Sequence, residues 1–449
     1  MERLFGTDGI RGIANRYPMN PHMALKLGAA CGHLFKTKGE EQVVVGRDTR
    51  ISGQMLEGAL QAGITSAGVD CLKVGVLPTP GISYLTRALS AKAGIVISAS
   101  HNPVEDNGIK FFGQDGYKLP DEMELMMEEE VLSEESRFIS PVGTDLGQVR
   151  EINDAGERYI EFLNRSISSS LHLKGLRIVI DCANGATSGI VPRLLEDLGA
   201  KLIVMNANPD GKNINLNCGS LHPEIMSQAV RDHQANLGLS FDGDGDRLIA
   251  VDEKGQVVDG DKIMVICALN LKEKGILSNH VVVVTVMSNI GLERALSPAG
   301  IKIVRTKVGD RYVVEGMQKE GANLGGEQSG HLIFLDHNTT GDGIITALQL
   351  LNVLREEDAP LSELAKKMKR FPQTLLNIGV KSKPNLTDLP EVMDAITTAE
   401  NKLGEDGRVL VRYSGTEPKV RVMVEGPTVE ETETMAKSIA AAIEKEIGQ

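Results

Sequence analysis

The sequence contains no tryptophan, and aromatic residues make up only 3% of its 449 residues. Its formal net charge is −13 at pH 7. It therefore lacks both the basic excess of a typical nucleic-acid-binding protein and the aromatic residues on which bases stack, so nucleic acid is not expected as a partner. An anionic ligand would instead be bound by local groups of arginine and lysine within an acidic background.

Cysteines are few and show no pairing pattern. There are 5, an odd number, dispersed without Cys-x-x-Cys spacing, which indicates reduced thiols rather than a disulfide framework or a zinc site. Residues 1–6 lack the apolar core of a signal peptide. The most apolar short run, residues 281–287, is too short to span a bilayer. We therefore expect a cytoplasmic protein without a membrane partner.

A chain of this length is too long for one hydrophobic core and indicates three or four domains. One pattern occurs three times: a β-branched run, a polar loop, an amphipathic stretch and a glycine that precedes another apolar run. The β-branched runs that begin the three copies are residues 42–46, 176–180 and 281–284. Their order predicts β–α–β units with mostly buried sheets, and their wide spacing favours three separate domains.

The pattern changes from about residue 371 onward. Strands are predicted at 375–380, 408–412 and 420–425, and helices at 389–403 and at the C-terminus. We therefore predict an α/β fold with three similar mixed α/β domains and a smaller C-terminal α+β domain. The predicted domain limits are 1–150, 151–254, 255–368 and 369–449.

A polar loop follows the apolar run at residues 93–97. Residues 98–103 read Ser-Ala-Ser-His-Asn-Pro, and α/β proteins commonly bind ligands in loops at strand ends. A nucleophilic serine needs an activating group or a metal nearby, and His101 and a downstream lysine are candidates. Taken alone, the motif is also typical of a simple turn before proline.

Three aspartates, Asp242, Asp244 and Asp246, alternate with glycines between two apolar strands. Alternate residues of a tight loop can converge on one cation, and carboxylate oxygens suit a hard metal such as Mg²⁺. With Glu253 the spacing also fits a calcium EF-hand, but Arg247 stands where that loop needs glycine and the flanks are strand-like. A solvated acidic turn is the other alternative, although three such close carboxylates repel one another without a cation.

Two further loops have ligand-binding compositions. Residues 325–331 read Gly-Gly-Glu-Gln-Ser-Gly-His, which suits a polyhydroxylated ligand. Residues 412–421 read Arg-Tyr-Ser-Gly-Thr-Glu-Pro-Lys-Val-Arg, and guanidinium groups, hydroxyls and backbone N–H groups together bind phosphate. Ordinary hairpins, the second of them charged, remain alternative interpretations.

Together, the four motifs in this order resemble the α-D-phosphohexomutase superfamily over essentially the whole chain. Residues 5–12, Phe-Gly-Thr-Asp-Gly-Ile-Arg-Gly, are similar to its N-terminal signature. The N-terminal motif, the Ser-Ala-Ser run and Glu-Gln-Ser in the third loop are most similar to members that act on glucosamine phosphates. The resemblance implies an isomerase that needs one Mg²⁺, forms glucosamine 1,6-bisphosphate as an intermediate and supplies amino sugar for peptidoglycan precursors.

The resemblance also implies roles for individual residues. Ser100 would carry a phosphoryl group and bind magnesium together with the three aspartates. Lys110 matches the family's acid/base position, and residues 308–311 form a loop that senses sugar identity. The other implied residues are Arg11, His101 and His331 for catalysis, Arg247, Glu327 and Ser329 for sugar binding, and Arg412, Ser414, Gly415, Thr416 and Arg421 for phosphate binding. Glu327 is the candidate partner of the sugar's C2 ammonium group.

Several alternatives stay open at this point. A phosphomannomutase/phosphoglucomutase would have the same fold, and a metal-dependent sugar phosphatase would release the phosphoryl group to water. A separate phosphate-binding loop favours a mutase over a phosphatase, and a non-catalytic sensor would need neither Ser100 nor the aspartates. We expect a small-molecule sugar phosphate as substrate and a possible homodimer.

Overall fold

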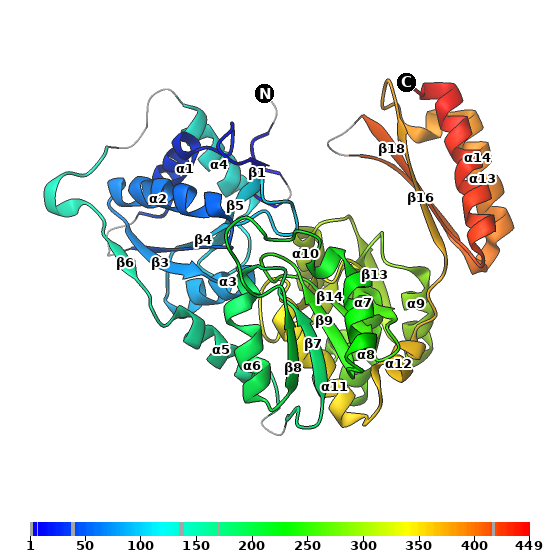
Figure 1. Cartoon of the computed structure of the whole chain (residues 1–449). Helices are drawn as coiled ribbons and strands as arrows, with labels where there is room; N and C mark the ends of the chain where they lie inside the picture. Colours follow the sequence, from blue (N-terminus) through cyan, green and yellow to red (C-terminus); the bar gives the residue numbers. More distant parts are fainter. Residues whose placement is uncertain (1–2, 7, 37–40, 134–138, 169–170, 415–417) are drawn as a thin grey trace. The chain divides into compact units, whose positions relative to one another are not determined.

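The computed structural model describes residues 3–6, 8–36, 41–133, 139–168, 171–414 and 418–449 (Figure 1). The chain divides into two compact units. The first comprises Met1–Met287 and Ile301–Lys367, and the second comprises Ser288–Gly300 and Met368–Gln449. Three mixed sheets lie in the first unit and one antiparallel sheet lies in the second, so the predicted fold class is confirmed.

The first sheet has six strands in the order β1-β5-β4-β2-β3-β6. They are β1 (Ile10–Ile13), β2 (Gln42–Arg47), β3 (Asp70–Val76), β4 (Ala93–Ile97), β5 (Asp106–Gly113) and β6 (Val149–Glu151). The helices are α1 (Pro21–Phe35), α2 (Ile51–Ser66), α3 (Thr79–Ala88) and α4 (Asp121–Leu132). Figure 1 shows α1, α2 and α4 on one face of this sheet. Val43 and Val45 of β2 point to that face and pack with Leu27 and Leu60, because side chains alternate along a strand.

The second sheet has the order β11-β10-β9-β7-β8, and the third has the order β13-β12-β14-β15. Their strands are β7 (Arg177–Asp181), β8 (Lys201–Met205), β9 (Leu237–Phe241), β10 (Leu248–Asp252), β11 (Val257–Val258), β12 (Val281–Thr285), β13 (Lys302–Thr306), β14 (Leu324–Gly326) and β15 (Leu332–Phe334). Helices of the first unit in this part of the chain are α5 (Ala155–Arg165), α6 (Val191–Asp197), α7 (Pro223–Asp232), α8 (Gly260–Glu273), α10 (Asp310–Glu320), α11 (Gly343–Glu356) and α12 (Leu361–Leu364).

These three sheets share one strand order. The common part is β5-β4-β2-β3 in the first sheet, β10-β9-β7-β8 in the second and β15-β14-β12-β13 in the third. In each, three strands are parallel and the third of them in chain order pairs with an antiparallel strand that follows it directly. The three runs predicted from the sequence are β2, β7 and β12, the first strand of each repeat.

The second unit is a three-stranded antiparallel sheet covered by helices. Its strands β16 (Gln373–Gly379), β17 (Arg408–Tyr413) and β18 (Lys419–Glu425) have the order β16-β18-β17. Helices α13 (Pro390–Leu403) and α14 (Val429–Ile447) lie side by side against it (Figure 1). The short helix α9 (Ile290–Leu296) also belongs to this unit. Its N-cap residue Asn289 donates hydrogen bonds to Phe371 O at 2.9 Å and Glu425 Oε1 at 3.0 Å. The predicted domain limits stay predictions.

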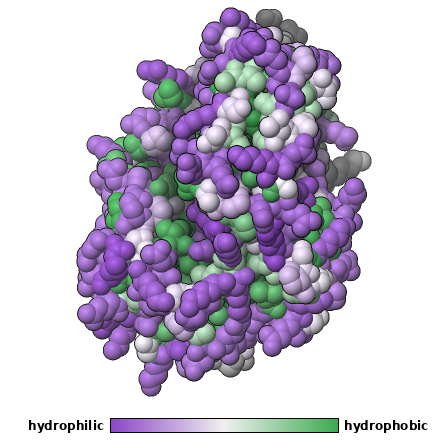
Figure 2. Space-filling view, turned by 90° about the vertical axis from the view of Figure 1, so that its right-hand side faces the viewer, coloured by the Kyte–Doolittle hydropathy of each residue, from purple (hydrophilic) through white to green (hydrophobic). Residues whose placement is uncertain are grey.

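Hydrophilic residues predominate on the face in Figure 2, where apolar residues occur in small groups. Among the described residues, no helix has the length and apolar composition required to cross a bilayer. All 5 cysteines are buried and free.

Candidate active site

Three of the predicted loops occupy equivalent positions in the three mixed sheets. The serine loop (residues 98–103) lies between β4 and β5, and the aspartate loop (residues 242–247) lies between β9 and β10. The Glu327 loop (residues 327–331) lies between β14 and β15. Each therefore begins at the carboxyl end of a parallel strand, which is where α/β sheets place ligand-binding groups.

Ser100 lies at the base of the serine loop with only 1% of its surface exposed. Its Oγ donates a hydrogen bond to Asp242 Oδ2 at 2.6 Å and lies 3.1 Å from His101 Nδ1. Its φ is 53°, a left-handed conformation that is unfavourable for residues with a side chain. Burial and two nearby guanidinium groups lower the pKa of His101 to about 4, so its imidazole is neutral near pH 7. The structure thus places the hydroxyl of Ser100, a residue with a strained backbone, directly against the aspartate loop.

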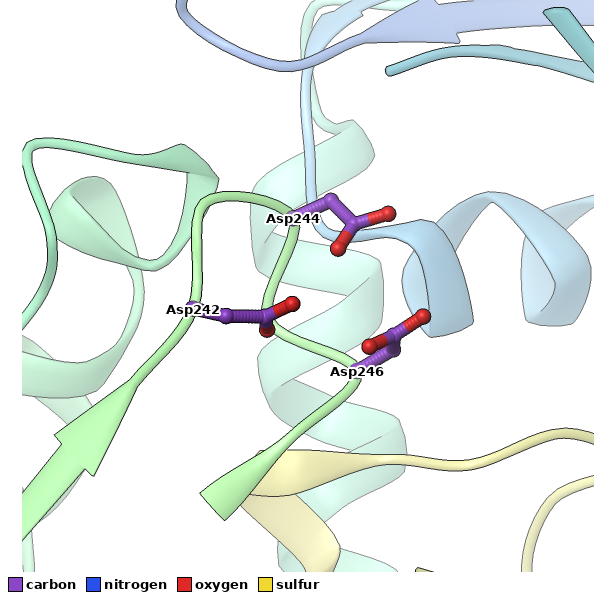
Figure 3. Close-up of side chains that lie close together, drawn as sticks. All are labelled: Asp242, Asp244 and Asp246. Carbon is purple, nitrogen blue, oxygen red and sulfur yellow. The ribbon is translucent and has the colours of Figure 1, made fainter. Parts of the chain in front are cut away.

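The three aspartates converge as the sequence predicts. They are buried, and one ligand atom from each lies within 4.8 Å of the others. In Figure 3 their side chains extend from one loop toward a shared region. Asp244 Oδ2 accepts hydrogen bonds from Thr79 Oγ1 at 2.6 Å and Lys110 Nζ at 3.0 Å. Asp244 Oδ1, by contrast, is buried and has no hydrogen-bond partner among the described residues.

The electrostatics of this triad favour a bound cation. Burial and the neighbouring carboxylates of Asp246 and Asp244 raise the pKa of Asp242 well above its usual range. Burial alone would also raise the pKa of Asp246, but His331, Lys110 and Arg247 outweigh it and hold that pKa low. A buried, all-oxygen donor set with an unpaired carboxylate oxygen fits a hard divalent metal.

Two cationic side chains from the first sheet lie beside the triad. Lys110 on β5 is 2% exposed, and its Nζ lies 3.0 Å from Asp244, 3.1 Å from Asp8 and 3.7 Å from Asp246. Burial lowers the pKa of Lys110, but the three carboxylates outweigh that effect and raise the pKa above its ordinary value. Arg11 pairs with Asp8 and donates to Ala99 O at 3.5 Å. Both residues are therefore positively charged, with Lys110 against the aspartate loop and Arg11 against the serine loop.

The Glu327 loop carries the groups predicted to bind a sugar. Glu327 is half-buried and Oε1 accepts a hydrogen bond from Gly309 N at 3.1 Å. Ser329 is exposed, with Oγ 3.4 Å from Glu327 Oε2. Arg247 donates its backbone N–H to Asp242 Oδ1 at 3.1 Å, and its Nε lies 3.8 Å from Asp246 Oδ1. The Glu327 loop also contacts the residue that follows the aspartate loop, because Leu248 N donates a hydrogen bond to Gly330 O at 3.0 Å.

His331 connects the same two loops. Its Nδ1 lies 3.5 Å from Asp246 Oδ1, and its Nε2 lies 3.6 Å from Asp310 Oδ2. Burial lowers the pKa of His331, but Asp246 and Asp310 outweigh it and raise the pKa to about 9. Gly341 packs against the ring so closely that a Cβ there would lie 2.3 Å from Nε2. His331 is therefore held as a cation in a fixed orientation.

The predicted phosphate-binding residues lie in the second unit. Arg412 on β17 and Arg421 on β18 are directly opposite each other in the antiparallel pair. Burial and the charge of Arg421 lower the pKa of Arg412, and two opposed guanidinium groups favour an anion between them. Ser414 is buried, with its backbone N–H donating to Lys419 O at 2.8 Å. Gly415 and Thr416 lie outside the described residues.

Some side chains of this site have contacts that no sequence motif predicts. Asp8 lies in the N-terminal motif and pairs with Arg11, Lys110 and Lys118. Lys118 also pairs with Asp310, at 2.6 Å from Oδ2. Thr79 begins α3 and contacts Asp244, as described above. The N-terminal motif around Asp8 could have indicated that this residue belongs to the site. The sequence around Thr79 and Lys118, by contrast, contains no motif that indicates their contacts with Asp244, Asp8 and Asp310.

Comparison with known families covers most of the chain. Domains I, II and III of the phosphoglucomutase/phosphomannomutase family, each described as alpha/beta/alpha, match residues 2–138, 157–255 and 259–371, and its C-terminal domain matches residues 375–442. A solved structure of a phosphoglucomutase/phosphomannomutase family protein from Burkholderia thailandensis has a TM-score of 0.83 at 25% identity, covering 100% of both chains. The superfamily resemblance is confirmed.

Curated relatives narrow the assignment. The chain is 56% identical over 446 residues to the phosphoglucosamine mutase of Carboxydothermus hydrogenoformans, which covers 99% of this chain and 100% of that protein. It is 53% identical over 449 residues to the phosphoglucosamine mutase of Citrifermentans bemidjiense, which covers 100% of this chain and 99% of that protein. The chain therefore belongs to the phosphoglucomutase/phosphomannomutase family and, within it, to the phosphoglucosamine mutases, which are isomerases.

Proposed function

We propose that the chain interconverts glucosamine 6-phosphate and glucosamine 1-phosphate through a phosphorylated Ser100, and so supplies amino sugar for peptidoglycan precursors. The observation that carries this proposal is the 2.6 Å contact between Ser100 Oγ and Asp242 Oδ2, at the edge of a buried aspartate triad. Relatives named phosphoglucosamine mutase, at 56% and 53% identity, support the substrate class.

We further propose that Asp242, Asp244 and Asp246, together with the phosphate on Ser100, hold one Mg²⁺. The unpartnered Asp244 Oδ1 and the mutual proximity of the three carboxylates support this ligand set. When bound, the ion supplies positive charge that stabilises a phosphoryl group in transfer.

The proposed reaction has two half-reactions. In the first, the bond between phosphorus and Ser100 Oγ breaks, phosphorus forms a bond to the free O1 or O6 of the sugar, and the proton of that hydroxyl passes to Ser100 Oγ. The sugar, now glucosamine 1,6-bisphosphate, turns around. In the second, the other phosphoryl group of the bisphosphate returns to Ser100 Oγ, and the proton of the Ser100 hydroxyl passes to the released sugar oxygen, so the phosphorylated enzyme is restored.

Charged side chains around Ser100 support this transfer. Lys110 and Arg11 are cations beside the triad and would stabilise negative charge on the moving group. We propose Lys110 as the acid/base residue, with its charged form, favoured by Asp244 and Asp8, as the proton donor. His101 and His331 would orient Ser100 and Asp246 respectively.

Substrate binding is proposed for the remaining residues. Glu327 would pair with the C2 ammonium group, Ser329 would bind a neighbouring hydroxyl, and Arg247 would bind the sugar beside them. Arg412, Ser414, Gly415, Thr416 and Arg421 would bind the phosphate that is not being transferred. Because the intermediate turns around, this second set must accept a phosphate from either end of the sugar.

Peptide mass spectrometry of the purified protein tests the proposal. A peptide containing phosphorylated Ser100 is expected, and Ser100→Ala should lose both that phosphate and turnover. Full turnover of Ser100→Ala would contradict the mechanism, and net release of phosphate without isomerisation would indicate a phosphatase. A large kcat/KM preference for mannose 6-phosphate or glucose 6-phosphate over glucosamine 6-phosphate would overturn the substrate assignment.

Two broader properties are also proposals. A cytoplasmic location is supported by the free, buried cysteines. A homodimer follows only from the family resemblance, and light scattering of the purified protein would test it.

A further inference from the structure

The backbone carbonyls of the serine loop are held from two sides. Arg50 Nη2 donates to Ser100 O at 3.1 Å and to Asn102 O at 2.8 Å. Asn215 Nδ2 donates to the same two oxygens, at 2.8 Å and 3.0 Å. Arg50 Nη1 also donates to Pro103 O. Two side chains from different parts of the chain thus bind the backbone carbonyls of the residues on either side of His101.

Arg50 is itself fixed by a buried network. Its side chain and that of Asp48 are both 0% exposed, and they form an ion pair at 3.0 Å. Ser98 Oγ donates to Asp48 Oδ2 at 2.6 Å and accepts from Ser100 N at 2.9 Å. A fully buried ion pair contributes little net stability because both charges must be desolvated. The ion pair is hydrogen-bonded to both backbone polar groups of Ser100, to its carbonyl oxygen through Arg50 and to its N–H through Ser98. This arrangement indicates that the pair orients Ser100.

Asn215 lies where the serine loop meets the aspartate loop. Its own N–H donates to Ala183 O at 2.9 Å, in the loop that follows β7. At Gly243 of the aspartate loop, a Cβ would lie 2.6 Å from Ser100 O and 2.8 Å from Asn215 Nδ2. The two loops therefore approach so closely that only glycine fits at position 243. The side-chain amide of Asn215 packs against Gly243 and Ser100 O at this point.

We propose that Arg50 and Asn215 are positioning residues for phosphoryl transfer. They hold the carbonyls of Ser100 and Asn102, and thereby keep Ser100 in its left-handed conformation with Oγ directed at Asp242. This inference rests on the proposed role of Ser100 as the phosphoryl carrier. In-line transfer tolerates little displacement of the reacting oxygen, so loosening this backbone slows transfer without removing a group that binds the sugar.

The chain offers a matched pair of variants for the test. Asn215 and Asn217 lie in the same loop and both have left-handed backbones, with φ of 57° and 50°. Asn217 is exposed, whereas the Asn215 amide contacts the serine loop. Replacing either by alanine therefore imposes a similar backbone cost, but only Asn215→Ala removes the two hydrogen bonds to Ser100 O and Asn102 O.

Asn215→Ala is expected to lower kcat by on the order of tenfold while KM for glucosamine 6-phosphate stays within about twofold. It should also raise the fraction of phosphorylated enzyme that is hydrolysed by water instead of transferring to sugar. Asn217→Ala should change neither quantity. Arg50→Lys, which keeps a charge beside Asp48 but loses the forked set of donors, should lower kcat further.

Equal kcat for Asn215→Ala and Asn217→Ala would overturn the inference, as would a change in KM alone. A lowered Tm for Asn215→Ala with unchanged kcat and unchanged hydrolysis would also overturn it, because that is the result of a purely structural role. If Arg50→Lys does not fold, the comparison of Asn215→Ala with Asn217→Ala still tests the inference. Failure of the proposed function is distinguishable, because Ser100→Ala would then keep its turnover whatever the asparagine variants do.

Discussion

Replacing Lys110 with methionine tests whether the buried carboxylates of the site are charged and held together by this cation. Lys110 Nζ lies 3.0 Å from Asp244 and 3.1 Å from Asp8, and its side chain is 2% exposed. At an effective dielectric constant of about 20, each contact corresponds to about 5 kcal/mol of Coulomb attraction. Desolvation of the ammonium offsets much of this, and removing one partner of a buried pair typically costs about 3–5 kcal/mol. We expect a loss of that size in metal-free protein.

Hydrogen exchange measured by mass spectrometry is the suitable assay. Peptides from β5 and β9 report the local free energy of opening, so the measurement does not require the whole chain to unfold in one step. The loss should shrink in excess Mg²⁺, because a cation at the triad replaces the missing charge. Lys73→Met is the matched control: Lys73 pairs with Glu151 at 2.9 Å on the surface, and its loss should stay below about 1 kcal/mol in both conditions.

A loss below about 1 kcal/mol for Lys110→Met in metal-free protein would refute this reasoning. It would mean that the surrounding carboxylates are protonated at neutral pH and that the ammonium offsets no negative charge. A loss of equal size with and without Mg²⁺ would separately refute the assignment of the cation to the three aspartates.

Three further changes probe other residues predicted to bind substrate or metal. Glu327→Gln should lower kcat/KM about tenfold for glucosamine 6-phosphate and much less for glucose 6-phosphate, because only the former presents an ammonium group; equal losses in coupled kinetic assays would contradict the assignment. The pKa of His331, about 9, exceeds the unfolded value of about 6.5, so its stabilising charge is complete below pH 6.5 and lost as pH rises toward 9. Mg²⁺ should lower this pKa by neutralising Asp246, and an NMR titration showing no change would count against a metal there. Arg421→Met should raise KM for the sugar phosphate about tenfold or more while phosphorylation of Ser100 persists, and unchanged KM would exclude Arg421 from phosphate binding.

Much of the strand framework could be predicted because short β-branched runs leave little choice of structure. The predicted run at 93–97 is β4, and the predicted aspartate loop lies between β9 and β10. Helices were less predictable. Helices α8 and α11 are buried over most of their surface, so they lack the polar stripe by which an amphipathic helix is identified.

The predicted site residues of the first unit converge, but several of their partners could not be found from the sequence. Thr79 lies 165 residues from Asp244, and Asn215 lies 115 residues from Ser100. Neither belongs to a motif with a chemical composition of its own. Such contacts depend on how the first and second sheets pack, which no local pattern encodes. The same holds for Arg50, an ordinary charged residue in sequence that the fold buries completely.

The repeated strand order explains why three separate motifs form one site. A single open α/β sheet offers one such ligand-binding edge, at the carboxyl ends of its parallel strands. Here that edge occurs three times, once in each sheet. In every case the predicted loop connects the last parallel strand in chain order to its antiparallel partner. The first loop supplies a hydroxyl, the second carboxylates, and the third a carboxylate and an imidazole. Ser100 meets Asp242 at 2.6 Å and Asp246 meets His331 at 3.5 Å, so consecutive repeats contact one another through these equivalent loops. Each sheet thus contributes a different set of side chains to the same region of the first unit.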